Sequence, residues 1–279
     1  MNARFSLDWL ERAPYRDLHP QLVAALRPLS AWPEPAHYDA LAQVVPRAAD
    51  VELPRFVKQS REALLEVGGY EQHVAQLGAV PTRPRHWHDF FNMIVWAHFP
   101  KLRWALNSIH VDPRVGPIDP RNGRAPAQNL AATFDESGVL VVSSSRSLLE
   151  ELRALRFKRV LWERREELVA TTHFWIVGHG TLESLLTPHP GLAAKGLLLH
   201  VPAIPAASEL DALRFDIDAR AAQRVASWRE RLTVLDPVPL LGLPGYCDNE
   251  RAAFYDDARY FRFERASRRP ASSADVGFE

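Results

Sequence analysis

The sequence contains a single cysteine and no excess of charge of either sign. Cys247 stands alone among 279 residues, which excludes a disulfide within the chain and a metal site built only from thiolates. Thirty-four basic side chains balance thirty-four acidic ones, so no overall field favours nucleic acid or an anionic membrane. We therefore expect a protein of a reducing compartment, the cytoplasm, that does not bind nucleic acid.

Long hydrophobic runs are also missing. The most apolar long stretch, residues 168–186, is interrupted by polar side chains that include His179 and Glu183, so no membrane-spanning helix is expected. The first eighteen residues carry acidic side chains and no continuous apolar segment, unlike a secretory signal. These features predict no association with a membrane.

Familiar catalytic motifs are absent as well. The sequence has no GxxxxGK(S/T) phosphate loop, no GxGxxG after a strand, no GxSxG nucleophile elbow and no CxxC pair. These absences exclude the usual nucleotide-binding, serine-hydrolase and dithiol chemistries. The motifs alone leave open whether the chain is an enzyme, which substrate it takes and in which oligomeric state it works.

The composition is that of an ordinary globular protein. With 47% hydrophobic and 24% charged residues, the chain can bury a substantial core. Periodicity predicts an α+β fold over residues 1–267, a mostly helical single domain with a small antiparallel sheet. Six prolines permit only short helices in residues 1–50, which we expect to wrap the core, and residues 268–279 are expected to form a disordered tail.

Local patterns predict the order of the elements. Residues 61–77 show helical spacing interrupted by Gly68 and Gly69. Residues 130–143 resemble a β-hairpin with its tip at 135–137. Ser147 with Glu150 resembles a capping box that opens a helical region reaching about residue 186, with a break inside it. The other predicted elements are a strand at 53–57, a loop at 112–126, a strand at 196–202 and a helix at 218–232.

The stretch from Arg85 to His110 is the most informative part of the chain. It contains four histidines, three tryptophans and two asparagines in an otherwise apolar run. An unpaired buried polar group costs about 1 to 3 kcal/mol, so these side chains need specific partners. Pro100 disfavours helix at Phe99 and suits the first turn of a new helix. The pattern therefore predicts helices at 87–99 and 100–110 whose polar ends converge.

Histidines and carboxylates near these ends form a candidate metal site. Imidazole and carboxylate are common ligands of divalent metals such as zinc and manganese. His179 and Glu183 lie four residues apart on one predicted helix face, and the glycines that flank His179 indicate the close approach of another segment. The predicted ligands are His88, His110, His179 and Asp135.

These residues suggest a hydrolase-like enzyme in which the metal lowers the pKa of a bound water. The candidate catalytic residues are His88, Asp89, His179 and Glu136. Two asparagines would orient substrate or ligands, and an arginine in the 112–126 loop would close over a small anionic ligand. These candidate binding residues are Asn92, Asn107 and Arg121.

Each candidate also has a structural explanation. A buried imidazole such as His88 needs only one hydrogen-bond partner, and His179 could serve packing between its glycines. Asp135 and Glu136 suit a solvated turn. The competing hypothesis is therefore a non-enzymatic binding or interaction protein whose polar cluster locks the core.

Several short segments resemble the signature of a family of uncharacterised bacterial proteins, a domain of unknown function found mainly in proteobacteria. They are Pro81-Thr82-Arg83, Trp87-His88-Asp89 with Asn92, Trp96, Phe99-Pro100, Asn107 with His110, Phe134-Asp135-Glu136 with Gly138, Gly178-His179 with Glu183, and Gly242-Leu243-Pro244-Gly245. The resemblance extends from about residue 50 to 262. It implies a soluble bacterial setting and transfers no catalytic residues.

Overall fold

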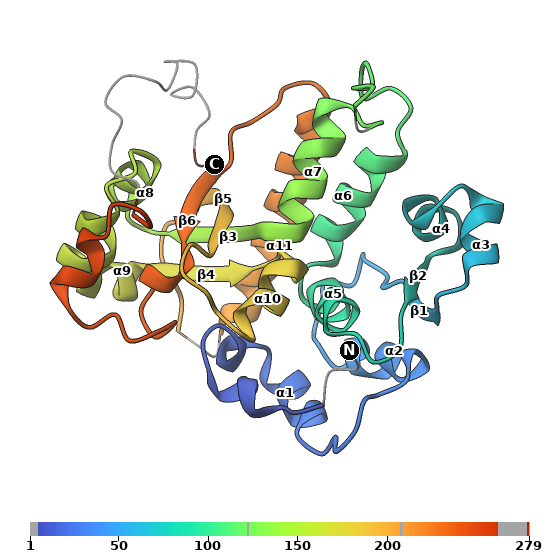
Figure 1. The fold of residues 1–279 in the computed structure, drawn as a ribbon, viewed down its shortest axis with the longest axis horizontal. Coiled ribbons are helices and arrows are strands. Elements are labelled where there is room, and N and C mark those ends of the chain that lie inside the picture. The colour runs from blue at the N-terminus through green and yellow to red at the C-terminus, as the bar shows by residue number, and fades with distance from the viewer. Residues whose placement is uncertain (1–4, 122, 207–208, 262–277, 279) are drawn as a thin grey trace.

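The computed structural model describes residues 5–121, 123–206, 209–261 and 278. Four strands form a mixed sheet near the middle of the molecule, in the order β4-β3-β5-β6 (Figure 1). β3 (Gly138–Ser143) pairs antiparallel with β4 (Thr172–Ile176) and parallel with β5 (Ala193–His200). β6 (Asp236–Pro239) pairs antiparallel with β5. The prediction of a mostly helical α+β fold with a small sheet is confirmed, but the sheet is mixed rather than antiparallel.

Helices pack around this sheet. α7 contacts β3 and β5, and α6 packs against both α7 and α11. α8 contacts β3, β5 and β6, and α9 contacts β4. Every residue of β3 is buried, as expected for a central strand that is covered by helices. The helices concerned are α6 (Pro100–Val111), α7 (Pro126–Ser137), α8 (Arg146–Arg153), α9 (Arg165–Thr171) and α11 (Leu210–Ala226).

The predicted break at Pro100 is confirmed. α5 (Trp87–His98) ends one residue before Phe99, and α6 begins at Pro100. Phe99 has φ −134° and ψ 57°, outside the helical region. All residues of α5 from Asp89 to His98 are buried, which agrees with its apolar character on every side.

The N-terminal segment packs on the first turn of α5. α1 (Pro20–Leu26) and α2 (Pro35–Gln43) both begin at a proline, whose fixed φ suits this position. The rings of Trp9 and Trp32 lie 5.8 and 4.4 Å from the ring of Trp87. This aromatic contact fixes the start of the helix that carries His88.

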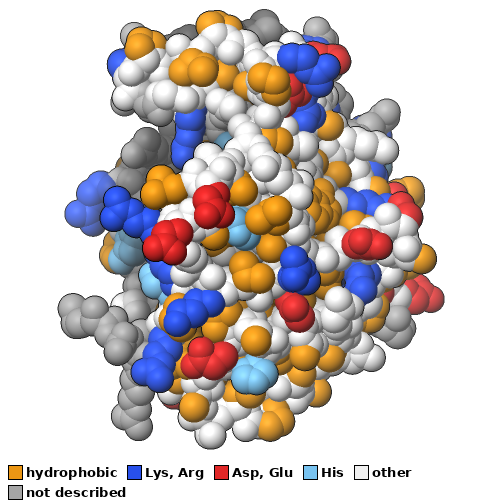
Figure 2. Space-filling model, turned by 90° about the vertical axis from the view of Figure 1, so that its right-hand side faces the viewer, with side chains coloured by type: hydrophobic (Ala, Val, Ile, Leu, Met, Phe, Trp, Pro, Cys, Tyr) orange, Lys and Arg blue, Asp and Glu red, His pale blue; other side chains and the backbone are white. Residues whose placement is uncertain are grey.

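A small lobe at the right of Figure 1 contains two parallel strands and two short helices. The glycine pair interrupts the helical pattern as predicted, because Gly68 ends α3 with φ 88°. Figure 2 shows hydrophobic, acidic and basic side chains interspersed on the face that includes this lobe. Its elements are β1 (Arg55–Lys58), α3 (Arg61–Val67), α4 (Tyr70–Leu77) and β2 (Ala79–Thr82).

The predicted hairpin at 130–143 is wrong. Its first half is the end of α7, which begins at Pro126 and is supported by a hydrogen bond from the Ala125 N–H to Gln128 Oε1 of 2.9 Å. Gly138 has φ −74°, so it does not form a tight turn. A Cβ there would lie 2.4 Å from the Phe134 carbonyl oxygen. The glycine permits the strand to leave the helix directly.

The predicted helical region from Ser147 to residue 186 is also wrong in part. The N-cap of α8 is Ser145, whose hydroxyl accepts the Leu148 N–H at 3.4 Å. Residues 172–176, THFWI, form β4 between α9 and α10 (His179–Leu185). β-branched and aromatic side chains favour this strand, which completes the sheet beside β3.

Other predicted boundaries shift modestly. The strands expected at 53–57 and 196–202 correspond to β1 and β5, and the helix expected at 218–232 is α11, which begins at Leu210. The expected disordered tail, 268–279, lies outside the described residues except for residue 278. Among the described helices, none combines the length and apolar character that crossing a membrane requires.

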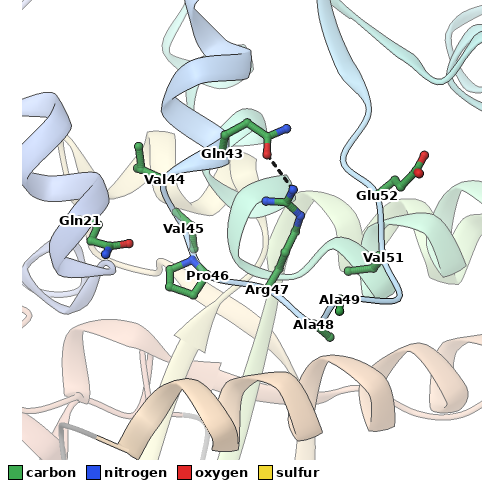
Figure 3. Close-up of a pocket in the computed structure, with 10 residues that line it drawn as sticks. All are labelled: Gln21, Gln43, Val44, Val45, Pro46, Arg47, Ala48, Ala49, Val51 and Glu52. Atoms are coloured by element: carbon green, nitrogen blue, oxygen red, sulfur yellow. Dashed lines mark hydrogen bonds between the residues drawn. The ribbon is translucent and has the colours of Figure 1, made fainter.

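An open pocket lies between the end of α2 and the segment that leads to β1 (Figure 3). Its volume is about 450 Å³, and most of its lining is aliphatic, alanine or proline. Arg47 lines it and donates to Gln43 Oε1 at 2.7 Å. None of the candidate catalytic, metal-binding or substrate-binding residues lines this pocket.

Candidate metal centre

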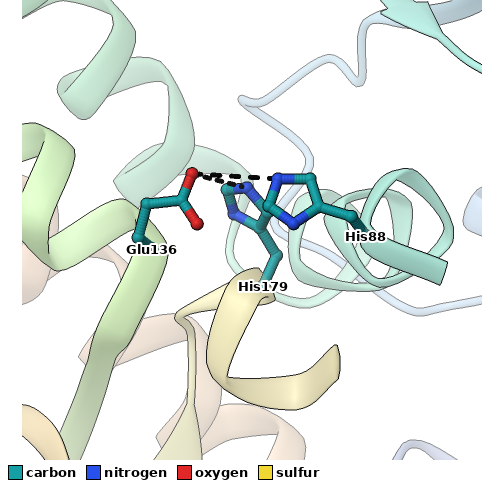
Figure 4. Close-up of side chains that lie close together, drawn as sticks. All are labelled: His88, Glu136 and His179. Carbon is teal, nitrogen blue, oxygen red and sulfur yellow. Dashed lines mark ion pairs between the residues drawn. The ribbon is translucent and has the colours of Figure 1, made fainter. Parts of the chain in front are cut away.

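Three helices bring His88, Glu136 and His179 together (Figure 4). His88 lies in the first turn of α5, His179 is the first residue of α10, and Glu136 lies in the last turn of α7. Glu136 Oε1 is 3.8 Å from His88 Nε2 and 3.6 Å from His179 Nε2. One ligand atom of each residue lies within 4.8 Å of the others. Metal bonds are about 2 Å long, so small side-chain movements allow all three to bind one ion.

Glycines allow α10 to approach α7 closely enough for this contact. A Cβ on Gly180 would lie 2.5 Å from Glu136 Oε2. A Cβ on Gly178 would lie 2.5 Å from the backbone nitrogen of Gly138. The close approach expected around His179 therefore exists, and the segment that meets the two glycines is the end of α7.

We expect Gly180→Ala to weaken metal binding with little loss of stability. The added Cβ would lie 2.5 Å from Glu136 Oε2, so this carboxylate must turn away from the two imidazoles, and 3.1 Å from the Glu136 backbone oxygen, which needs to shift only slightly. Gly178→Ala is the matched comparison, because its Cβ meets backbone and should destabilise the fold by about 1 to 3 kcal/mol. Zinc titration and urea unfolding of both variants measure the difference. Equal zinc affinity of Gly180→Ala and the unaltered protein would contradict the expected role of Glu136.

A second carboxylate faces the outer nitrogen of each imidazole. His88 Nδ1 is hydrogen-bonded to Glu183 Oε2 at 3.2 Å. His179 Nδ1 faces Asp135 Oδ1 at 3.8 Å. A carboxylate behind a histidine ligand fixes the ring and its tautomer, so that the opposite nitrogen is presented to the metal. The arrangement turns both Nε2 atoms toward the same space.

Asp135 belongs to a buried polar network behind His179. It forms an ion pair with Arg103 of α6, whose side chain is 5% exposed. Arg103 also donates to Asn92 Oδ1 at 2.9 Å, and Asn92 donates to the Tyr70 hydroxyl at 2.9 Å. A buried arginine requires such a counter-ion. This pair was not predicted from the sequence; the presence of an arginine between apolar residues of the 100–111 stretch is the signal that could have indicated it.

The environment keeps His179 in the form that binds metals. Burial, and then electrostatic interactions with Arg103, His88 and Arg83, lower the pKa of His179 well below its usual value. The imidazole is therefore neutral near pH 7, which leaves a lone pair for coordination.

The charges around the cluster leave room for a cation. Arg103 pairs with Asp135, and Arg83 pairs with Asp89. Within the described part of the chain, Glu136 and Glu183 form ion pairs only with histidines. Two carboxylates without a lysine or arginine partner, beside a neutral imidazole, favour a divalent cation.

Comparison with known protein families gives a match over residues 54–265 to proteins of unknown function, DUF3025. The chain belongs to the DUF3025 family. The matched region agrees with the extent of the resemblance found in the sequence, and it contains all three residues of the cluster and both carboxylates behind the imidazoles. No curated protein and no solved structure matches the chain.

Asp89 of this DUF3025 protein is not part of the cluster that its neighbour His88 joins. It accepts the backbone N–H of Arg83 at 2.6 Å and two guanidinium hydrogen bonds at 3.0 and 2.6 Å. Its carboxylate thus ties the loop before α5 to the first helical turn. Asp89 therefore has hydrogen-bond partners within the fold, and its catalytic role stays a prediction.

We expect Asp89→Asn to destabilise the fold by about 1 to 3 kcal/mol, because hydrogen bonds to a charged partner are lost at a buried position. Zinc affinity should stay within about twofold of its original value. Asp119→Asn is the matched control, since Asp119 pairs with Arg121 in the same side-on way in an exposed loop, where such pairs contribute little. Thermal melts and zinc titrations of both variants decide the matter. Loss of zinc binding in Asp89→Asn would show that Asp89 takes part in the metal site.

The two asparagines proposed for substrate binding are occupied within the fold. Asn92 joins Arg103 to Tyr70, as described above. Asn107 donates to the backbone oxygen of Glu71 at 3.0 Å and to its carboxylate at 2.7 Å. These bonds connect α6 to α4 and α5 and satisfy the amides without a substrate.

His110 and Arg121 are not part of the cluster. His110 lies seven residues after Arg103 on α6, which is about 10 Å farther along the helix. The Gln128 side chain donates to its backbone oxygen at 2.9 Å. Arg121 pairs with Asp119 in the exposed loop before α7. The DUF3025 cluster therefore contains Glu136 in place of His110 and Asp135, which the sequence had suggested as ligands.

Proposed function

We propose that this DUF3025 protein is a metal-dependent hydrolase, with a divalent cation held by His88, Glu136 and His179. One observation carries the proposal: both imidazoles direct Nε2 at the same carboxylate, while a different carboxylate faces each Nδ1. Such carboxylate-histidine pairs are typical of zinc sites. Two imidazoles and a carboxylate suit zinc first and manganese second.

A set of three protein ligands leaves a coordination position for water, as catalytic zinc sites do. The Glu136 side chain is 55% exposed, so water and a substrate can reach the cluster from this side. A bound metal lowers the pKa of its water toward 7 and supplies a hydroxide nucleophile. Glu183 and Asp135 hold the two imidazoles in place while the water attacks.

A structural role is favoured for the polar groups outside the cluster. Asp89, Asn92 and Asn107 each bind residues of the fold, as the competing hypothesis of a non-enzymatic binding protein requires. That hypothesis does not explain why two imidazoles direct Nε2 at one carboxylate.

Hydrolysis of activated substrates tests the proposal. We expect the zinc-loaded protein to cleave at least one nitrophenyl ester, phosphate or glycoside in a panel, and Glu136→Gln to reduce the rate at least about 100-fold, because a charged ligand is lost. Asp119→Asn is the control, since Asp119 lies in an exposed loop apart from the cluster. Zinc-independent cleavage, or full activity in Glu136→Gln, would overturn the metal mechanism.

A further inference from the structure

Arg83 offers an unused donor beside the cluster. Its Nε and Nη2 both bind the Asp89 carboxylate, which holds the guanidinium plane in a fixed direction. Its Nη1 has no hydrogen-bond partner among the described residues, and its side chain is 45% exposed. Arg83 thus presents a rigid, charged edge to the solvent.

This donor is held on the helical turn that carries His88. Asp89 directly follows His88 on α5, and the His86 ring stands edge-on to the His88 ring at 6.1 Å. His86 Nδ1 also faces Asp89 Oδ1 at 3.9 Å. The positive charge of Arg83 contributes to the lowered pKa of His179, after burial and the interactions with Arg103 and His88. Arg83 and His86 therefore flank the cluster from the side of α5.

We propose that Arg83 and His86 form an anion subsite next to the metal and that it receives the phosphoryl group of a phosphate ester. This inference rests on the metal role proposed above. A phosphate monoester has three terminal oxygens, enough for the metal, Arg83 and His86 at once, whereas a carboxylate has only two. Nε and Nη2 of Arg83 already bind Asp89, so Arg83 offers its remaining Nη1 to one phosphate oxygen, together with the positive charge of its guanidinium.

The subsite fits a balanced hydrolysis. The water oxygen forms a bond to phosphorus, and the bond from phosphorus to the ester oxygen breaks with its electron pair left on that oxygen. A proton from the water passes to the leaving oxygen, which gives an alcohol and inorganic phosphate. Arg83 holds negative charge on the terminal oxygens throughout, and no oxidant or further reactant is needed.

Binding of inorganic phosphate tests the subsite. Calorimetry is performed on protein loaded with one equivalent of zinc and on metal-free protein, with Arg83→Gln, His86→Asn and Arg121→Gln. Arg121 is the matched control, because it is also held side-on by an aspartate and lies apart from the cluster. We expect Arg83→Gln to weaken phosphate binding at least about tenfold and Arg121→Gln to change it less than about twofold. His86→Asn keeps the Arg83 pair with Asp89 and should also weaken binding, so the test survives if Arg83→Gln folds poorly.

The outcomes separate this inference from the metal role. Normal zinc binding with phosphate affinity indifferent to Arg83 and His86 would overturn the subsite and leave the metal centre standing. Arg83-dependent phosphate binding in a protein that takes up no metal would support the subsite and overturn the metal role. Acetate that binds as tightly as phosphate, with the same dependence on Arg83, would overturn the assignment to a phosphate ester.

Discussion

Replacing His179 with glutamine is expected to reduce zinc affinity by more than about 100-fold. Loss of a group that only supports a ligand already costs about 10- to 100-fold, and His179 is itself one of three ligands in the proposed centre. His88→Gln and Glu136→Gln should have effects of similar size, because each removes one of the same three ligands. Competition titration with a chromophoric chelator measures all three.

His110→Gln is the matched control for this series. It makes the same exchange at a histidine that the sequence suggested as a ligand and that the structure places outside the cluster. Its zinc affinity should stay within about twofold of the original. If His110→Gln lost zinc as completely as His179→Gln, the centre would be built differently from the arrangement in Figure 4.

Asp135→Asn is expected to have the second largest effect, on stability and on zinc together. The change leaves the buried Arg103 without its counter-ion, which costs about 3 kcal/mol. It also removes the carboxylate that faces His179 Nδ1, so zinc affinity should fall about 10- to 100-fold. Urea unfolding and zinc titration report the two effects separately.

Two further variants distinguish the positioning of the imidazole ligands from the stability of the fold. In Arg103→Gln/Asp135→Asn, removal of both charges should restore part of the lost stability but none of the zinc affinity. Glu183→Gln should weaken zinc binding with little loss of stability, because the Glu183 side chain is 39% exposed. Recovery of zinc affinity in the double variant would show that Asp135 acts only through the stability of the fold.

The sequence predicted the helix breaks that single proline and glycine residues cause. Pro100 cannot continue the helix before it, and Gly68 readily adopts the positive φ that ends α3, so both breaks were found. β4 was missed because THFWI lies between two helical stretches and becomes a strand only by pairing with β3. Its stability comes from contacts that are distant in sequence, which periodicity does not report.

The sequence predicted both histidine ligands of the candidate site but not its carboxylate ligand. His88 and His179 were found because polar side chains in apolar surroundings require partners. The choice between Asp135 and Glu136 depended on local structure, because neighbours on a helix point about 100° apart. In α7, Glu136 therefore faces the Nε2 atoms, while Asp135 pairs with Arg103 behind His179. The hairpin prediction placed both at a solvated tip and gave no basis for this choice.

The metal content of the full chain, purified without a polyhistidine tag or chelator, tests the account most directly. We predict about one zinc ion per chain, measured by elemental analysis against protein concentration, and no bound zinc when His88, Glu136 and His179 are all replaced by glutamine. A folded protein that binds neither zinc nor manganese in titration would contradict the account.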